Sequence, residues 1–343
     1  MIWILQKVMP GYFAIKESAI KVHRLRANHF TGLADLNCPP LTTLKTKNMT
    51  MLAKVLLALA AAAGSVQAHE GPVNCDNCAK WNKPVKPFNV YGNTWYVGVD
   101  GLSSLLLTGP QGHILLDGGL PQSAPLIEAN IKALGFQMKD VKLIVNSHAH
   151  WDHAGGIAAL QHASGAMVAA SPSGALVLQS GTNGVDDPQY QANPVVHVAK
   201  VAKVNVVHEG ETLKVGTIGI TAHMTPGHTP GSTTWSWTSC EGQRCLDVVY
   251  ADSLNPVASG DFNYTGKGRT PDISASFAAS IAKVAALKCD IVISVHPDFT
   301  DVMEKAAART PERNPFIDAN GCREYAADAG KRLAKRLEQE RGE

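Results

Sequence analysis

Three histidines and one aspartate lie within six residues, in the stretch His148-Ala149-His150-Trp151-Asp152-His153. Imidazole nitrogens and carboxylate oxygens are ligands that zinc prefers in proteins. The apolar run at 141–145, directly before the stretch, is typical of a buried strand, which would place the ligands on a loop at its C-terminal end. Gly155 and Gly156 would let the chain turn tightly into a helical stretch at 157–162, so that the side chains converge. The stretch predicts a metal site.

The four ligand groups are too many for one catalytic zinc ion, which uses three protein ligands and keeps one open position. We therefore interpret the stretch as half of each of two neighbouring metal sites. The alternative is a polar surface loop, the usual location of a lone histidine, but it does not account for this density of ligand groups. The remaining ligands are expected elsewhere in the chain.

Two later histidines follow predicted strands. His228 lies in a turn at 225–232 that two prolines and two glycines make rigid, and His296 follows the apolar run 290–295 and precedes Pro297. Both are candidate metal ligands. Five other histidines lack this combination of a strand and a rigid turn, and we interpret them as surface groups or as groups behind the ligands: His113, His162, His197, His208 and His223.

Length and composition favour a soluble enzyme. The chain has 343 residues, of which 45% are hydrophobic, so it can bury a large core. Its formal net charge of +2 gives no electrostatic case for a nucleic acid or an acidic partner. We therefore expect no nucleic-acid partner.

The segment 51–68 has the pattern of a secretory signal. Met51-Leu52-Ala53-Lys54 precedes an apolar run at 55–63, and Val66-Gln67-Ala68 resembles a cleavage site, so the mature chain would begin at His69. Because a signal belongs at the N-terminus, the start of translation is expected at Met49 or Met51. The alternative is a genuine extension at 1–48 and a membrane anchor at 51–63, but that run is shorter than the roughly 20 residues of a spanning helix.

We therefore expect an upstream segment and signal at 1–68 and one catalytic domain at 69–343. The location would be the periplasm, without stable membrane insertion after the signal is removed.

The cysteine count agrees with export. Of seven cysteines, Cys38 lies in the upstream segment, which leaves an even number that three disulfides could use. The spacing of Cys240 and Cys245 would close a hairpin, Cys289 and Cys322 could tie the C-terminal segment to the body, and Cys75 and Cys78 remain as a short local bridge. Zinc-binding thiolates or a redox pair at Cys75 and Cys78 are the alternative.

Short apolar runs alternate with helical patterns along the mature chain. Strands are expected at 96–99, 104–107, 113–117, 141–145, 166–170, 204–207, 217–222, 233–237, 248–251 and 290–295, and helices at 124–134, 173–179, 273–288 and 323–340. Strands precede a helix in each half. This order favours an α/β fold with two mixed sheets packed face to face and helices outside, an αββα sandwich.

These residues resemble the metallo-β-lactamases, and specifically their third subclass, whose first zinc site is all histidine and whose second is Asp-His-His. The similarity extends over most of the mature chain. It is carried by the stretches 91–98, 117–119, 148–153, 226–231, 251–253 and 296–297.

The resemblance implies two Zn²⁺ per chain and a set of ligands. The first zinc would be held by His148, His150 and His228. The second would be held by Asp152, His153 and His296.

The resemblance also implies the substrate contacts. Ser253 stands where other subclasses have a cysteine ligand, and with Asn255 it would contact the substrate. Family members often carry Ser or Thr at the position of Asn255, but an amide can still donate a hydrogen bond there.

The implied activity is hydrolysis of the β-lactam amide of penicillins, cephalosporins and carbapenems by a zinc-bound hydroxide, conferring antibiotic resistance. Asp152 would orient the nucleophile, and Asp117 would fix the ligand loop from behind. A monomer is favoured.

Two alternatives remain open. A glyoxalase-like thioesterase or a lactonase shares the ligand stretch, and Asp252 would separate it from a lactamase because its carboxylate would bridge the two metals. A periplasmic metal-scavenging protein is disfavoured, since a storage site would close the open coordination positions.

Overall fold

The computed structural model describes residues 71–191, 198–267 and 270–342. The predicted signal, its cleavage site, the start of translation and His197 lie outside the described residues.

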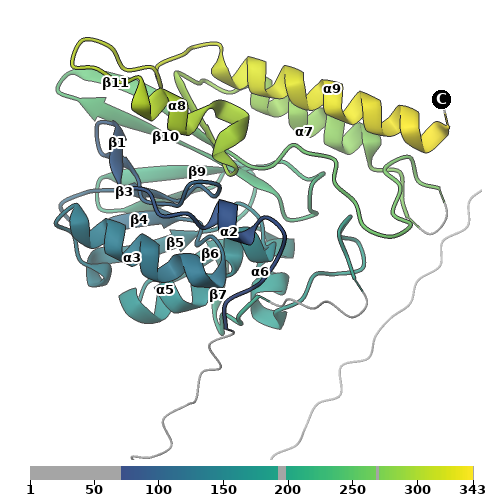
Figure 1. The fold of residues 1–343 in the computed structure, drawn as a ribbon, viewed down its shortest axis with the longest axis horizontal. Coiled ribbons are helices and arrows are strands. Elements are labelled where there is room, and N and C mark those ends of the chain that lie inside the picture. Colours follow the sequence, from purple (N-terminus) through teal and green to yellow (C-terminus); the bar gives the residue numbers. More distant parts are fainter. Residues whose placement is uncertain (1–70, 192–197, 268–269, 343) are drawn as a thin grey trace, which may run out of the picture. The chain divides into compact units, whose positions relative to one another are not determined.

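Two β-sheets form the centre of the fold (Figure 1). The first has the order β1-β2-β3-β4-β5-β6-β7, antiparallel from β1 to β4 and parallel from β4 to β7. Its strands are Phe88–Tyr91, Thr94–Tyr96, Leu105–Leu107, His113–Leu116, Val141–Val145, Met167–Ala170 and Val204–Val206. Both antiparallel hairpins and parallel crossovers are therefore present in one mixed sheet.

The second sheet has the order β12-β11-β10-β9-β8. Its strands are Thr212–Val215 (β8), Ile218–Met224 (β9), Thr233–Glu241 (β10), Arg244–Ala251 (β11) and Ile291–Ser294 (β12). Only β11 and β12 are parallel, because helix α7 connects them.

The helices complete the layers. The α-helices are Cys78–Trp81 (α2), Ala124–Ala133 (α3), Trp151–Ala154 (α4), Ile157–Ser164 (α5), Pro172–Ser180 (α6), Ser274–Ala286 (α7), Val302–Ala307 (α8) and Gly321–Arg341 (α9). The 3-10 helices are Pro121–Ser123 (η1), Met138–Asp140 (η2) and Pro297–Thr300 (η3). In Figure 1, α3 and α5 cover one outer side, while α7 and α9 run together on the other.

Alternation along the strands explains this layering. In β5, Leu143 and Val145 pack between the sheets, whereas Ile144 faces the layer of α3, α5 and α6. In β11, Tyr250 faces the other sheet and Val249 faces α7 and α9. The central strands of each sheet therefore bury both faces, and the predicted αββα sandwich is confirmed.

The C-terminal helix is more than a cover at the surface. Tyr325, Ala329 and Leu333 of α9 are buried in the core beside α7. The hydroxyl of Tyr325 donates to the carbonyl of Asp252 at 2.8 Å and accepts from the backbone N–H of Leu254 at 3.2 Å. Helix α9 therefore supports the segment that follows β11, which leads to the site described below.

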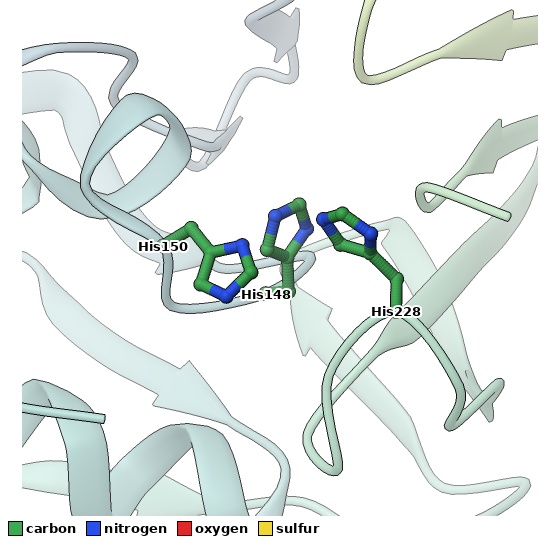
Figure 2. A group of neighbouring side chains, drawn as sticks. All are labelled: His148, His150 and His228. Carbon is green, nitrogen blue, oxygen red and sulfur yellow. The ribbon is translucent and has the colours of Figure 1, made fainter. Parts of the chain in front are cut away.

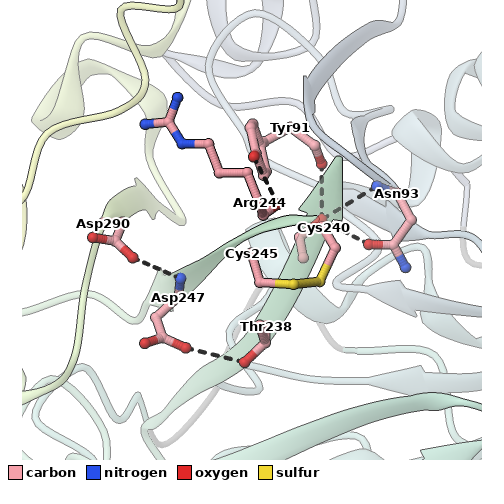
Figure 3. The surroundings of a disulfide bond; sticks show 9 residues. Tyr91, Asn93, Thr238, Cys240, Arg244, Cys245, Asp247 and Asp290 are labelled. Carbon is pink, nitrogen blue, oxygen red and sulfur yellow. Dashed lines mark hydrogen bonds between the residues drawn. A yellow bond between two sulfur atoms is a disulfide. The ribbon is translucent and has the colours of Figure 1, made fainter. Parts of the chain in front are cut away.

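Three disulfides join cysteines of the described chain: Cys75 to Cys78, Cys240 to Cys245 and Cys289 to Cys322. Figure 3 shows the bond between Cys240 and Cys245 at the tip of the β10–β11 hairpin. At the same tip, the hydroxyl of Tyr91 donates to the carbonyl of Arg244 at 3.0 Å. The tip is thus fixed both covalently and by the first sheet.

Among the residues that the structure describes, no helix combines the length and the apolar character that a membrane span requires.

Candidate metal centre

Strand β5 delivers the ligand loop, which we define as residues 146–156. β5 lies between β4 and β6, and four of its five residues are buried. His148 and His150 follow it, while Asp152 and His153 lie in the first turn of α4. All four side chains are buried, so the strand brings them to the C-terminal edge of the sheet as predicted.

Asp117 holds the ligand loop from behind. It follows β4 with a positive φ of 58°, and its carboxylate accepts hydrogen bonds from Asn146 Nδ2 at 2.9 Å and from the Ser147 backbone N–H at 2.7 Å. The Tyr250 hydroxyl, from the second sheet, also donates to it at 2.9 Å. Burial raises the pKa of Asp117 to about 6. The predicted supporting role of Asp117 is confirmed.

The two glycines of the ligand loop are required for a different reason than the predicted tight turn. Gly155 and Gly156 have ordinary helical backbone angles, with φ of −58° and −85°. A Cβ atom on Gly156 would lie 2.3 Å from the Gly118 carbonyl oxygen, and one on Gly155 would lie 2.4 Å from Pro121. Close approach of the segment after β4 therefore excludes a side chain at both positions.

His148, His150 and His228 form the first group of ligand atoms. Figure 2 shows their imidazoles facing one another, two from the ligand loop and His228 from the turn before β10. One ligand atom from each lies within 4.8 Å of the others. His228 is separated from the loop in sequence by two strands of the first sheet, β6 and β7, and two of the second, β8 and β9, yet the fold brings it beside His148 and His150.

In each ring of this group, the other nitrogen carries an N–H that donates a hydrogen bond to the protein. His148 Nδ1 donates to Asp252 Oδ1 at 2.6 Å. His150 Nε2 donates to both oxygens of Asp187, at 3.0 and 3.2 Å. His228 Nδ1 donates to the carbonyl of Asn255 at 2.8 Å. This pattern is typical of histidines that bind metal ions.

Asp152, His153 and His296 form the second group. Asp152 Oδ2 lies 3.4 Å from His153 Nε2 and 3.5 Å from His296 Nε2, and the two nitrogens are 3.2 Å apart. Two ligand atoms of a tetrahedral zinc ion with bonds of about 2.1 Å would lie about 3.4 Å apart. The three distances therefore fit one ion.

Unpaired buried atoms also fit metal binding. His148 Nε2, which belongs to the first group, is buried and makes no hydrogen bond. A buried imidazole nitrogen without a partner is costly unless something else occupies it. A cation at the first group would provide the missing partner.

The electrostatics keep several rings in the neutral form that metal ions need. Burial lowers the pKa of His228 and of His296 to about 4, and burial together with the neighbouring His153 lowers that of His148 well below its usual value. Burial acts to lower the pKa of His150 as well, but the adjacent Asp187 carboxylate outweighs burial, so the pKa of His150 is raised. A neutral imidazole offers a lone pair, as a ligand must.

Asp152 is held in its charged form. Burial acts to raise its pKa, but the charges of His153 and His296 outweigh burial and lower the pKa well below the usual value. In turn Asp152 raises the pKa of His153 against the opposing effect of burial. The second group therefore contains an ionised carboxylate, which is the form that binds a cation.

A pocket of about 800 Å³ opens onto both groups. His150, Asp152, His228 and His296 line it, together with Ser253 and Asn255, the two predicted substrate contacts. Trp81, Trp151 and Phe299 supply aromatic walls. The Ser253 hydroxyl is buried and has no hydrogen-bond partner in the described part of the chain, so it is free to bond a ligand.

Asp252 does not stand between the two groups in the way that a bridging carboxylate would. Its Oδ1 accepts from His148 Nδ1, the ring nitrogen opposite to the free Nε2. Within the described residues, Asp252 belongs to neither cluster of converging ligand atoms. Oδ1 of Asp252 therefore orients His148, and Oδ2 is buried without a hydrogen-bond partner in the described chain. The absence of Asp252 from both clusters agrees with the lactamase pattern rather than with the thioesterase alternative.

Three of the histidines outside the two ligand groups lie where we expected them, at the surface or away from the ligand atoms. His162 and His208 are exposed, and His223 hydrogen-bonds to the Ser236 hydroxyl at 2.8 Å. His113 was expected at the surface or behind the ligands, and this was wrong. It is buried against Phe136 at the opposite end of β4 from Asp117, because the edge-on aromatic contact covers its ring.

Sequence reasoning missed Asp187 and Gln189. Both lie in the polar loop after α6, and Gln189 Nε2 lies 3.4 Å from both His150 Nδ1 and His228 Nε2. No strand or turn motif marks this loop, so only the folded chain brings it to the first group.

Comparisons with known proteins agree with the geometry. A family model described as the metallo-beta-lactamase superfamily matches residues 97–240. The Rm3 metallo-beta-lactamase is 49% identical, with a TM-score of 0.75 over 78% of this chain and 100% of that one. MEM-A1, a subclass B3 metallo-beta-lactamase from a soil metagenome library, is also 49% identical, with a TM-score of 0.74 over 76% of this chain and 99% of that one.

A more distant relative belongs to another branch. The hydroxyacylglutathione hydrolase of Anaeromyxobacter dehalogenans (strain 2CP-C) is 29% identical over 200 residues, which is 58% of this chain and 61% of that protein, less than two thirds of its length. The B3 enzymes match at higher identity and over nearly their whole length. The chain belongs to the metallo-β-lactamases, in subclass B3.

Proposed function

We propose that this protein hydrolyses the β-lactam amide of penicillins, cephalosporins and carbapenems, and that His148, His150 and His228 hold one Zn²⁺ while Asp152, His153 and His296 hold a second. The observation that carries the proposal is the pair of adjacent ligand groups that line one pocket. Each group offers three ligands and leaves room for a further one, as catalytic zinc sites do.

The reaction adds water across the amide. The C–N bond of the lactam breaks, the carbonyl carbon gains a hydroxyl and the nitrogen gains a proton. When bound, zinc ions at these groups would supply an activated water and polarise the carbonyl.

The chain's own residues hold and orient the reactants. The ionised Asp152 lines the pocket, where its carboxylate can accept a hydrogen bond from the attacking water. The unpartnered Ser253 hydroxyl can donate to the substrate carboxylate, with the Asn255 amide lining the same wall. The aromatic rings of Trp81, Trp151 and Phe299 can pack against the apolar parts of the antibiotic.

The thioesterase activity of the distant relative is the second candidate. Two observations disfavour it: Asp252 is absent from the groups of converging ligand atoms in the described chain, and its Oδ1 is hydrogen-bonded to His148. The test is to assay a chromogenic cephalosporin, a carbapenem and a glutathione thioester with the zinc-loaded protein, with and without a chelator. Chelator-sensitive turnover of both antibiotics is expected, and turnover of the thioester alone would refute the proposal.

The proposal extends to location. Residues 1–68 would be an upstream segment and a secretory signal, with translation starting at Met49 or Met51, and residues 69–343 would work in the periplasm and give resistance to β-lactams. The signal pattern in the sequence and the paired cysteines of the described chain support export. The intact mass of the protein recovered from the periplasm should correspond to a chain that begins at His69. A mass that includes Cys38 would contradict the predicted cleavage.

A further inference from the structure

The loop at 181–191 places one buried carboxylate among exposed neighbours. Asp187 is only 4% exposed, whereas Val185 is 78% exposed and Asp186 is also exposed. The carboxylate of Asp187 lies against His150, whose Nε2 is 3.0 Å from Oδ2 and 3.2 Å from Oδ1. A loop whose neighbouring residues 184–186 are exposed therefore directs one carboxylate inward, against His150.

An imidazole ring carries one proton in its neutral form, so fixing that proton on one nitrogen leaves the lone pair on the other. In His150 the two oxygens of Asp187 can only accept, which places the proton on Nε2. Nδ1, the nitrogen on the side of His228, then keeps its lone pair. Rotating the ring would break both contacts with Asp187.

We propose that Asp187 is the positioning residue of the first metal site, which fixes the tautomer and the orientation of His150 so that Nδ1 faces the ion. The inference rests on the proposed metal site and adds a residue that determines its affinity. Asp187 does not touch the reacting atoms.

Two hydrogen bonds within the loop hold Asp187 in its position beside His150. The Gln189 backbone N–H donates to Asp187 Oδ1 at 2.7 Å, and the Asp187 N–H donates to the Gly184 carbonyl at 3.0 Å. These bonds fix the carboxylate before a metal arrives, so little conformational freedom is lost on binding.

A further contact links the supports of two ligands. The Ser259 N–H donates to the Pro188 carbonyl at 2.9 Å, which joins the loop of Asp187 to the segment of Asn255. The Asn255 carbonyl accepts from His228 Nδ1. The supports of His150 and His228 are therefore one connected unit, while His296 is held elsewhere, by a contact of its Nδ1 with the Gly101 carbonyl at 3.3 Å.

Removal of the Asp187 carboxylate should therefore lower metal affinity at the first site and leave the second site unchanged. Loss of a carboxylate behind a metal-binding histidine typically weakens metal affinity by about 10- to 100-fold. We expect that loss at the first site in Asp187→Ala and a smaller loss in Asp187→Asn, whose amide oxygen can still accept from Nε2. Asp186→Ala is the matched control, because it removes the same charge from the exposed neighbouring residue.

The experiment measures zinc affinity by competition with a chromophoric chelator in variants that keep a single site. In the His296→Ala background, which retains the first group, Asp187→Ala should lower the affinity and Asp186→Ala should not. In the His228→Ala background, which retains the second group, neither should change it. Equal affinities for Asp187→Ala and its parent in the first background, or equal weakening in both backgrounds, would overturn the proposal.

A spectroscopic measurement separates positioning from mere support of the loop. In the zinc-loaded protein with ¹⁵N-labelled histidine, the Nε2–H resonance of His150 should be protected from exchange. Asp187→Ala should shift or lose this resonance, while the Nδ1–H resonances of His148 and His228 remain. An unchanged His150 resonance would overturn the proposal. Both measurements are independent of hydrolysis, so a protein that binds zinc as expected but cleaves no β-lactam would refute the proposed function and leave this inference standing.

Discussion

The indole of Trp81 packs against the imidazole of His296, with ring centroids 5.3 Å apart. Trp81 is the last residue of α2, and the Cys75–Cys78 disulfide lies at the beginning of this short helix. Apart from the contacts of its Nε2 within the second group, the hydrogen-bonding support of the His296 ring in the described chain is the 3.3 Å contact of Nδ1 with the Gly101 carbonyl. The three histidines of the first group have shorter bonds to buried partners. The second group therefore depends on an aromatic contact from the N-terminal segment.

Trp81→Ala should weaken zinc binding at the second group and leave the first group unchanged. An aromatic pair contributes about 0.5–1.5 kcal/mol beyond the area it buries, which corresponds to roughly a 2- to 13-fold loss of affinity. Trp81→Phe is the control, because it keeps an aromatic ring over His296. Zinc competition in the His228→Ala background measures the effect, and equal affinities for Trp81→Ala and Trp81→Phe would show that the ring does not support His296.

His228→Ala should reduce β-lactam hydrolysis by at least about 100-fold while the protein stays folded, because it removes one of three ligands from the first group but little of the core. His223→Ala is a matched control on the preceding strand β9. The His223 ring is hydrogen-bonded to the Ser236 hydroxyl and belongs to neither ligand group. Steady-state hydrolysis and bound zinc should be measured together. Near-normal turnover by a folded His228→Ala protein would remove this residue from the site.

The Cys289–Cys322 disulfide should contribute more to stability than Cys240–Cys245. It closes a loop with a sequence separation of 33 residues, against 5 for the other bond. The loop-closure relation gives about 4 kcal/mol and about 2 kcal/mol respectively. Urea unfolding of the two double Cys→Ala variants tests this difference. If the Cys240→Ala/Cys245→Ala protein were the less stable one, strain or packing would outweigh loop length.

The ligand set could be predicted because metal chemistry leaves dense, local signals. His148, His150, Asp152 and His153 occupy one loop after one apolar strand, and His228 lies in a turn rich in Gly and Pro. The alternation of residues in the strands also predicted the two packed sheets. Local patterns of this kind survive in the sequence because the chemistry requires neighbouring positions.

The supports of these ligands leave no comparable signal. Asp187 is 37 residues from His150, and the Asn255 carbonyl acts through the backbone, so its side chain carries no information about the bond with His228. Trp81 reaches His296 from the other end of the domain sequence. A glycine can also be required for an unexpected reason, since Gly156 permits close approach to Gly118 at a helical φ. Such contacts depend on tertiary structure alone.

Ser253 provides the sharpest test of mechanism, because its buried, unpartnered hydroxyl faces the pocket as a nucleophilic serine would. The following residues, Leu254, Asn255 and Pro256, do not form the Ser-x-x-Lys pattern of serine β-lactamases, and no lysine lines the pocket within the described chain. Ser253 therefore has no base to activate it, and its hydroxyl is better suited to bonding the substrate.

Ser253→Ala should therefore keep measurable activity and lose on the order of 10- to 100-fold, as expected for the loss of a supporting hydrogen bond. Ser259→Ala, at another serine that lines the pocket, serves as the control with near-normal activity. Inhibitors of the clavulanate type, which trap an active-site serine, should have no effect, whereas a zinc chelator should abolish turnover. A covalent acyl adduct on Ser253, detected by mass spectrometry during turnover, would replace metal-dependent hydrolysis with nucleophilic catalysis by this serine.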